Sequence, residues 1–145
     1  GLGPCTGLTI YNPKTKQGWM GHFVNPVFER HNITEMLGEA AASGPLDSLR
    51  VWVRGGQSSG IEPGPYTVDY SVMGKIEMEE LLTSACFDVN SADISYDPRL
   101  WDEGSTAQSL NVETGEFKSV VMGPDTMLRQ LGTLGLAAEP QTQVS

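Results

Sequence analysis

Apolar residues in the first third of the chain come in short runs separated by polar turns. Residues 7–11 (GLTIY) and 18–24 (GWMGHFV) are rich in strand-forming side chains, and the Asn-Pro step at 12–13 favours a turn between them. A third run, residues 49–53 (LRVWV), alternates apolar and long polar side chains before a double glycine. The pattern predicts a β-hairpin from the first two runs and a further strand from the third.

Two segments show the three- to four-residue apolar spacing that is typical of an amphipathic helix. The first, residues 29–43, ends at a Gly-Pro stop signal, and the second covers residues 72–85. The positions expected to face the core are Ile33, Met36, Leu37, Ala40 and Ala41 in the first segment, and mostly Ile76, Met78, Leu81 and Leu82 in the second.

The rest of the chain contains shorter elements. In chain order, the pattern predicts a loop over 57–65, a strand over 87–96, a loop over 97–108, a hairpin of 109–112 with 117–122, a short helix over 125–134 and a polar, flexible tail over 139–145. Strands and helices alternate without the strict period of βαβ units. We therefore expect one mixed α/β domain over 1–138.

Charge and length narrow the function classes. The 145 residues carry 9 Lys and Arg against 18 Asp and Glu, a net charge of -9 that opposes binding to nucleic-acid phosphates and to anionic lipid. No apolar run approaches the roughly 20 residues needed to cross a bilayer. We expect neither a nucleic-acid partner nor membrane insertion, and a cytoplasmic location because no signal-peptide pattern opens the chain. The start at Gly1 without Met indicates a trimmed or excised piece as an alternative to a complete chain.

Cysteine and histidine are scarce, which limits the chemistry available. Cys5, Cys86, His22 and His31 are the full set, and they lack the spacing of a zinc site, so we expect no metal and no cofactor. Cys86 follows a predicted helix and is interpreted as a core residue. His31 is interpreted as a solvated or capping residue. A single disulfide is the less favoured alternative to two free thiols.

Cys5 lies in a segment that favours an exposed turn, because Gly3 and Pro4 restrict the backbone immediately ahead of an apolar strand. Such a turn can present a thiol and can leave backbone N–H groups directed at it, as an oxyanion hole requires. A neighbouring histidine can lower a thiol pKa from its usual value of about 8.5. The predicted hairpin can bring His22 toward Cys5. Composition alone favours packing roles for both residues.

The N-terminal residues resemble the CheD family of chemoreceptor glutamine deamidases. The resemblance is carried by Gly1-Leu2-Gly3-Pro4-Cys5, by the hairpin strands, and by His22, since the family places a histidine 17 residues after its cysteine and here 22 - 5 = 17. The segment Asn111-Val112-Glu113-Thr114-Gly115-Glu116 is similar to the family's terminal hairpin. The resemblance covers most of residues 1–122.

The resemblance implies a function and a fold. Cys5 would be the nucleophile and His22 the general base of a thiol amidohydrolase that converts a protein glutamine to glutamate through a thioester. The partner would be a chemoreceptor-like protein, with a chemotaxis signalling protein as a further partner. The implied fold is a layered sandwich of mixed sheet with helices packed on it. Related toxin deamidases share the Cys-His arrangement, so a secreted effector is one alternative, and a non-catalytic CheD-like binding module is another.

Two departures from the family affect the site. The family orients its histidine with a threonine six residues before the cysteine, a position that would be 5 - 6 = -1 in this numbering. Thr6 and Thr9 are the candidates to replace it, although ordinary strand roles are favoured for both. The family's Gly-Gly-Thr-Thr-Gly-Arg stretch is replaced here by residues 103–108 (EGSTAQ), which changes the expected partner surface.

Overall fold

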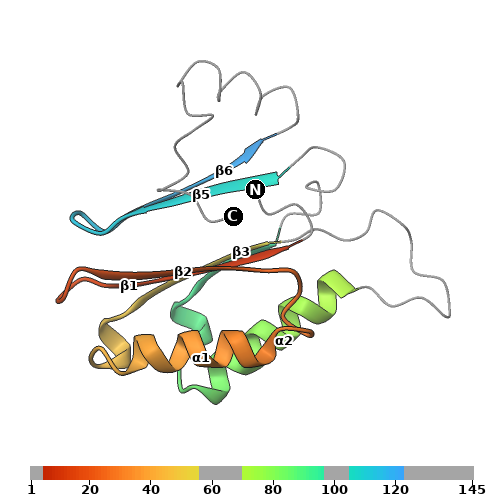
Figure 1. Ribbon diagram of the computed structural model, residues 1–145, viewed down its shortest axis with the longest axis horizontal. Helices are drawn as coiled ribbons and strands as arrows, with labels where there is room; N and C mark the ends of the chain where they lie inside the picture. Colours follow the sequence, from red (N-terminus) through yellow and green to blue (C-terminus); the bar gives the residue numbers. More distant parts are fainter. Residues whose placement is uncertain (1–4, 56–69, 97–104, 123–145) are drawn as a thin grey trace, which may run out of the picture.

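The computed structural model describes residues 5–55, 70–96 and 105–122 of the chain. Two helices, a four-stranded sheet and a two-stranded sheet are stacked in that order, as Figure 1 shows from bottom to top. The predicted mixed α/β class is confirmed at this level. The predicted helix over 125–134, the flexible tail and the loop over 57–65 lie outside the described residues.

The four-stranded sheet has the order β2-β1-β3-β4. Its strands are β1 (Thr6–Asn12), β2 (Gln17–Phe23), β3 (Arg50–Gly55) and β4 (Asp93–Tyr96). The hairpin partner β2 and the strand β3 pair antiparallel with β1 on its two sides, and β4 pairs parallel with β3. The predicted hairpin and third strand are therefore confirmed.

Strand β1 is buried along its whole length, because both faces of the central sheet are covered. Neighbouring side chains of a strand point to opposite faces. Leu8 and Ile10 belong to the apolar core on the helix side. Tyr11 contacts the turn of the two-stranded sheet on the other side. Side chains at odd positions of β1 therefore face the space between the two sheets.

Helices α1 (Arg30–Ala41) and α2 (Tyr70–Ser84) cover the lower face of the sheet in Figure 1. Both predicted helices are confirmed, and most of the expected inward positions are buried. The helical residues of the core are Ile33, Leu37, Ala40, Met78, Leu81 and Leu82. Ile76 was expected on this face but is 50% exposed. The expectation was wrong because two helical positions span about 200°, which places Ile76 opposite Met78.

The predicted strand over 87–96 is shorter than expected. A 3-10 turn, η2 (Val89–Ser91), occupies its first half, and only Asp93–Tyr96 forms β4. The Asp88 carboxylate accepts hydrogen bonds from the Asn90 N–H at 3.0 Å and the Ser91 hydroxyl at 2.8 Å. Asp, Asn and Ser favour turns through such side-chain bonds, which here outweigh the strand preference of the apolar residues. A second 3-10 turn, η1 (Leu46–Ser48), precedes β3.

The two-stranded sheet consists of β5 (Ser105–Asn111) and β6 (Glu116–Met122), paired antiparallel. The predicted terminal hairpin is confirmed, but β5 begins four residues before the predicted position 109. The expectation of a loop was therefore wrong for residues 105–108. Those residues extend the ladder by pairing with residues 119–122.

The turns of the two hairpins are built alike. The side-chain oxygen of Asn12 accepts hydrogen bonds from the backbone N–H groups two and three positions later, at 3.0 and 3.3 Å. The side-chain oxygen of Asn111 does the same in the second hairpin, also at 3.0 and 3.3 Å. The fourth residue after each asparagine has a positive φ, 57° at Lys16 and 76° at Gly115. Each asparagine side chain thus supplies the acceptor for two backbone N–H groups of its turn.

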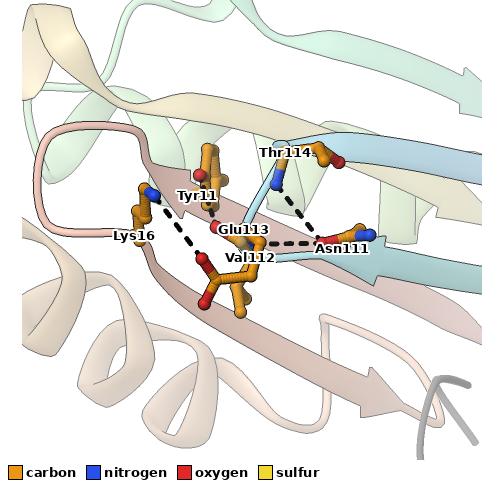
Figure 2. Close-up of polar contacts among 6 residues, drawn as sticks. All are labelled: Tyr11, Lys16, Asn111, Val112, Glu113 and Thr114. Carbon is orange, nitrogen blue, oxygen red and sulfur yellow. Dashed lines mark hydrogen bonds and ion pairs between the residues drawn. The ribbon is translucent and has the colours of Figure 1, made fainter.

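The two turns also contact each other, as Figure 2 shows. The Tyr11 hydroxyl donates to the Val112 carbonyl at 2.6 Å, and the Lys16 ammonium lies 3.4 Å from the Glu113 carboxylate. A Cβ on Gly115 would lie 2.7 Å from the Tyr11 ring. These contacts fix the tip of the two-stranded sheet against the β1–β2 hairpin.

Replacing Gly115 with alanine is expected to destabilise the protein by about 1–3 kcal/mol, because a Cβ at φ +76° is strained and would press on the Tyr11 ring. Lys16→Gly is the matched control at the equivalent turn position: it relieves the left-handed conformation and removes the exposed Lys16–Glu113 ion pair, two small opposing effects that should leave stability within about 1 kcal/mol of the wild type. Urea unfolding followed by circular dichroism measures both variants. Equal stability of Gly115→Ala and the wild type would contradict the expectation.

Candidate active site

The β1–β2 hairpin brings the segment at Cys5 and His22 to the same end of the central sheet. Cys5 immediately precedes β1, and His22 in β2 is the register partner of Gly7. Residues two positions apart in a strand share a face, and Cys5 is two positions before Gly7. Diagonal neighbours on an antiparallel ladder are roughly 7–8 Å apart, within reach of long side chains. Cys5 and His22 therefore lie at the same end of the hairpin, with Cys5 one residue before the first pair of the ladder, Thr6 with Phe23.

Glu29 links the two residues electrostatically. Its carboxylate accepts a hydrogen bond from the Val24 N–H, which ties the start of α1 to the end of β2. Burial raises the pKa of the Cys5 thiol, and the negative charge of Glu29 adds to that rise. Burial lowers the pKa of the His22 imidazole, and the charge of Glu29 partly opposes that decrease. Both groups therefore respond to the same carboxylate.

The direction of these pKa shifts is opposite to the one expected for a thiol that a neighbouring histidine helps to ionise. A raised thiol pKa and a lowered imidazole pKa both favour the neutral forms at pH 7. Among the described contacts, no hydrogen bond joins Cys5 Sγ to His22. The two shifts therefore act against a preformed thiolate–imidazolium pair.

Alkylation of Cys5 by iodoacetamide is expected to be slow at pH 7.5 in the substrate-free protein. Each unit by which a thiol pKa rises lowers its thiolate fraction about tenfold, and the thiolate is the reacting species. The rate of alkylation should therefore increase as pH rises, and it should reach half its maximum at a pH above the usual pKa of a thiol. Exposed Cys86 is the internal control and should label faster. Peptide mapping after timed labelling from pH 6 to 10 measures both, and faster labelling of Cys5 at neutral pH would contradict the expectation.

Of the two candidate orienting threonines, one shares the face of His22. The Thr6 hydroxyl lies 3.3 Å from the Tyr96 hydroxyl, and Thr6 pairs with the core residue Phe23 on the helix side. Thr9 follows Gly7 on the face of His22 and is fully buried. Thr9 is therefore the better placed of the two. Gly3 and Pro4, expected to shape an oxyanion hole, lie outside the described residues.

Cys86 was expected in the core, but it is exposed and has φ +68°. It occupies the left-handed position that ends α2: the Cys86 N–H bonds to the Thr83 carbonyl at 3.0 Å, and the Phe87 N–H bonds to the Leu82 carbonyl at 2.9 Å. This is the Schellman pattern, in which the residue after the left-handed one packs inward. The core position belongs to Phe87, and both cysteines are free.

The His31 side chain is 93% exposed on α1, in agreement with a solvated role. The described residues include no group of three or more His, Cys, Asp or Glu side chains that could hold a metal ion. No helix in the described ranges has the length and apolar character needed to cross a membrane.

Sequence reasoning missed two residues of this region. Glu29 was considered only as the start of a helix. It follows His22 by 29 - 22 = 7 residues and is close enough to act on the pKa of the imidazole. Gln108 was assigned to a loop, yet it is a buried residue of β5. The available signal was its spacing, since Gln108 precedes Leu110 by two and therefore shares the inward face of a strand.

The chain was compared with known proteins. No protein-family model matches the sequence, and the search among curated proteins gives no match. The interpretation of the site therefore depends on its residues and their arrangement.

Proposed function

We propose that this protein is a thiol-dependent protein-glutamine deamidase in which Cys5 is the nucleophile and His22 the general base. The observation that supports the proposal is the hairpin register, which pairs His22 with Gly7, two positions after Cys5. A cysteine and a histidine at one end of a rigid hairpin are the minimum pair for acyl transfer through a thiol. The similarity of the N-terminal residues to the CheD family supports the same assignment.

The proposed reaction has two steps. His22 takes the thiol proton as Cys5 Sγ attacks the carboxamide carbon of a glutamine, and the tetrahedral intermediate collapses with cleavage of the C–N bond. The proton held by His22 passes to the departing nitrogen, which leaves as ammonia. His22 then takes a proton from water, whose oxygen attacks the thioester. Cleavage of the C–S bond releases the glutamic acid side chain while His22 returns its proton to the Cys5 sulfur, and the acid then gives its own proton to solvent to form the carboxylate.

The neutral state of the pair suits this sequence. A neutral imidazole at pH 7 is already a proton acceptor, and burial favours that state by lowering the pKa of His22. Because the Cys5 pKa is raised, the thiol holds its proton until substrate is bound. The nucleophile is then formed at the moment of attack, which protects it from oxidation and from unrelated electrophiles.

The proposed substrate is a protein, with a chemoreceptor-like glutamine as the first choice and a cytoplasmic chemotaxis role. A secreted effector that deamidates a host protein is the alternative within the same chemistry. A non-catalytic binding module is the second candidate, and the observation in its favour is that no hydrogen bond joins Cys5 and His22 among the described contacts. Activity measurements separate these possibilities.

The test is incubation of the full chain with the purified cytoplasmic domain of a chemoreceptor. Ammonia release and tandem mass spectrometry should show conversion of specific glutamines to glutamate, and rapid acid quenching should trap a thioester on the peptide containing Cys5. Conversion of glutamines in a eukaryotic cell extract, with none in the chemoreceptor, would support the effector alternative. Stable complex formation without ammonia release would replace the deamidase proposal with the binding module.

A further inference from the structure

Three residues between the two sheets have buried polar side-chain atoms without a hydrogen-bond partner in the described part of the chain. Thr9 in β1 is 0% exposed, and Gln108 in β5 is 2% exposed. The Thr9 hydroxyl, both polar atoms of the Gln108 amide and Nε2 of His22 in β2 are buried and have no partner within the described part of the chain. We call Thr9, His22 and Gln108 the inter-sheet polar group.

The register of the sheets indicates that these residues belong to one region. Thr9 follows Gly7, the register partner of His22, on the same face of the hairpin. On β5, Leu110 faces the hairpin, because a Cβ on Gly18 would lie 2.7 Å from Leu110 Cδ2. Gln108 is two positions from Leu110 and so shares its inward face.

The position of Gln108 along the hairpin follows from the neighbouring contacts. Val112 accepts a hydrogen bond from Tyr11 at the turn end of β1. The partner of Leu110 on β6 is Phe117, which stacks on Trp52, and Trp52 is the register partner of Thr9. The path from Val112 in the turn, through Leu110, to Gln108 in β5 therefore runs from the turn end of the β1–β2 hairpin toward the pair of Gly7 and His22.

Packing alone gives no reason for these residue types. A buried donor or acceptor without a partner costs about 1–3 kcal/mol, whereas an apolar residue of the same size avoids that cost. Valine would fill the volume of Thr9, and leucine or methionine would fill most of that of Gln108. Unsatisfied buried polar groups in a folded protein call for a specific explanation, of which a role at a functional site is one.

We propose that Thr9 and Gln108 are positioning residues that hold His22 with its proton on Nε2. The proposal rests on the deamidase function proposed above. Both residues carry an acceptor oxygen, and because none of these atoms bonds directly to another within the described part of the chain, the proposed link from the Nε2 N–H group to them runs through one bound water. With the proton held at buried Nε2, Nδ1 is the nitrogen that accepts the Cys5 proton. This is the orienting task that a base histidine requires from a second residue.

The test uses the substrate-free protein first. In the wild type, imidazole ¹⁵N shifts should show the Nε2–H tautomer for His22, with solvent-exposed His31 as the internal reference. Thr9→Val and Gln108→Leu should each shift His22 toward a mixture of tautomers, and Thr9→Ser should restore the wild-type spectrum. Ser109→Ala, the neighbour on the opposite face of β5, is the matched control and should leave His22 unchanged.

Stability and kinetics complete the test. Thermal unfolding should show Thr9→Val and Gln108→Leu as stable as the wild type or more so, which separates positioning from a folding defect. With an active substrate, each should lower kcat about 10-fold or more with little change in KM. An unchanged His22 tautomer in both variants would overturn the positioning role even if ammonia release is intact. If the wild type releases no ammonia while the tautomer responds, the deamidase function fails and the positioning of His22 stands.

Discussion

Replacement of Cys5 by serine is expected to abolish ammonia release while leaving the fold intact. A serine hydroxyl is far less acidic than a thiol and is a weaker nucleophile unless a site is arranged to activate it, whereas this site is proposed to act on sulfur. The expected loss is about 10³-fold or more, equivalent to about 4 kcal/mol of transition-state stabilisation. His22→Ala should cause a loss of similar size, because nucleophile and base act as one unit.

Matched controls exist for both substitutions in the same chain. Cys86→Ser makes the same chemical change at an exposed cysteine, and His31→Ala does so at an exposed histidine. Neither control should alter the rate. Steady-state ammonia release should be compared for all four variants, with circular dichroism and thermal unfolding to verify the fold. Retention of most wild-type activity by Cys5→Ser or His22→Ala, on a protein that the wild type does deamidate, would rule out the thiol mechanism.

The parts of the fold that the sequence predicted well are those with a local signal. The β1–β2 hairpin has two apolar runs and an Asn-Pro turn, and α1 has regular spacing of Ile33, Leu37 and Ala40. Predictions failed where a side-chain bond or a distant strand decides the structure. The Asp88 bonds shorten β4, and the pairing of residues 105–108 with 119–122 extends β5. The Asp88 bonds leave no periodic pattern in the sequence, and the two-residue spacing of Gln108 and Leu110 is too short a signal to fix the start of β5.

The sequence predicted that Cys5 and His22 lie at one end of the hairpin, but it did not predict the direction of their pKa shifts. The spacing between Cys5 and His22 and the hairpin between them indicated their proximity. The direction of their pKa shifts depends on burial between the sheets and on Glu29, which requires knowledge of how the layers stack. For the same reason Gln108 was missed, since its importance comes from the sheet that faces it. The sequence of β5 alone does not identify that sheet.

Truncation of Phe117 should be the most damaging single change to the contact between the two sheets. The Phe117 ring stacks on Trp52, with centroids 4.7 Å apart and planes at 15°, and the Arg54 guanidinium lies 5.2 Å from its centre. Arg54 in turn binds the Asp93 carboxylate at 3.0 Å, so Phe117 is connected through β3 to β4. Phe117→Ala removes the stacking, the cation–π contact and apolar burial together. We expect a loss of about 2–4 kcal/mol in the free energy of unfolding.

The effect of Phe117→Ala should be local as well as global, because Phe117 holds the layer that covers the face of His22 and Thr9. Val120→Ala is the matched control: Val120 lies on the outer face of the same strand, is 49% exposed, and should change stability by no more than about 0.5 kcal/mol. Hydrogen exchange followed by mass spectrometry should show faster exchange throughout β5 and β6 in Phe117→Ala, before that of β1 increases, and iodoacetamide should label Cys5 faster. Equal exchange of β5 and β6 in the two variants would mean that the turn contacts of Tyr11 and Lys16, and not the aromatic stack, hold the second sheet in place.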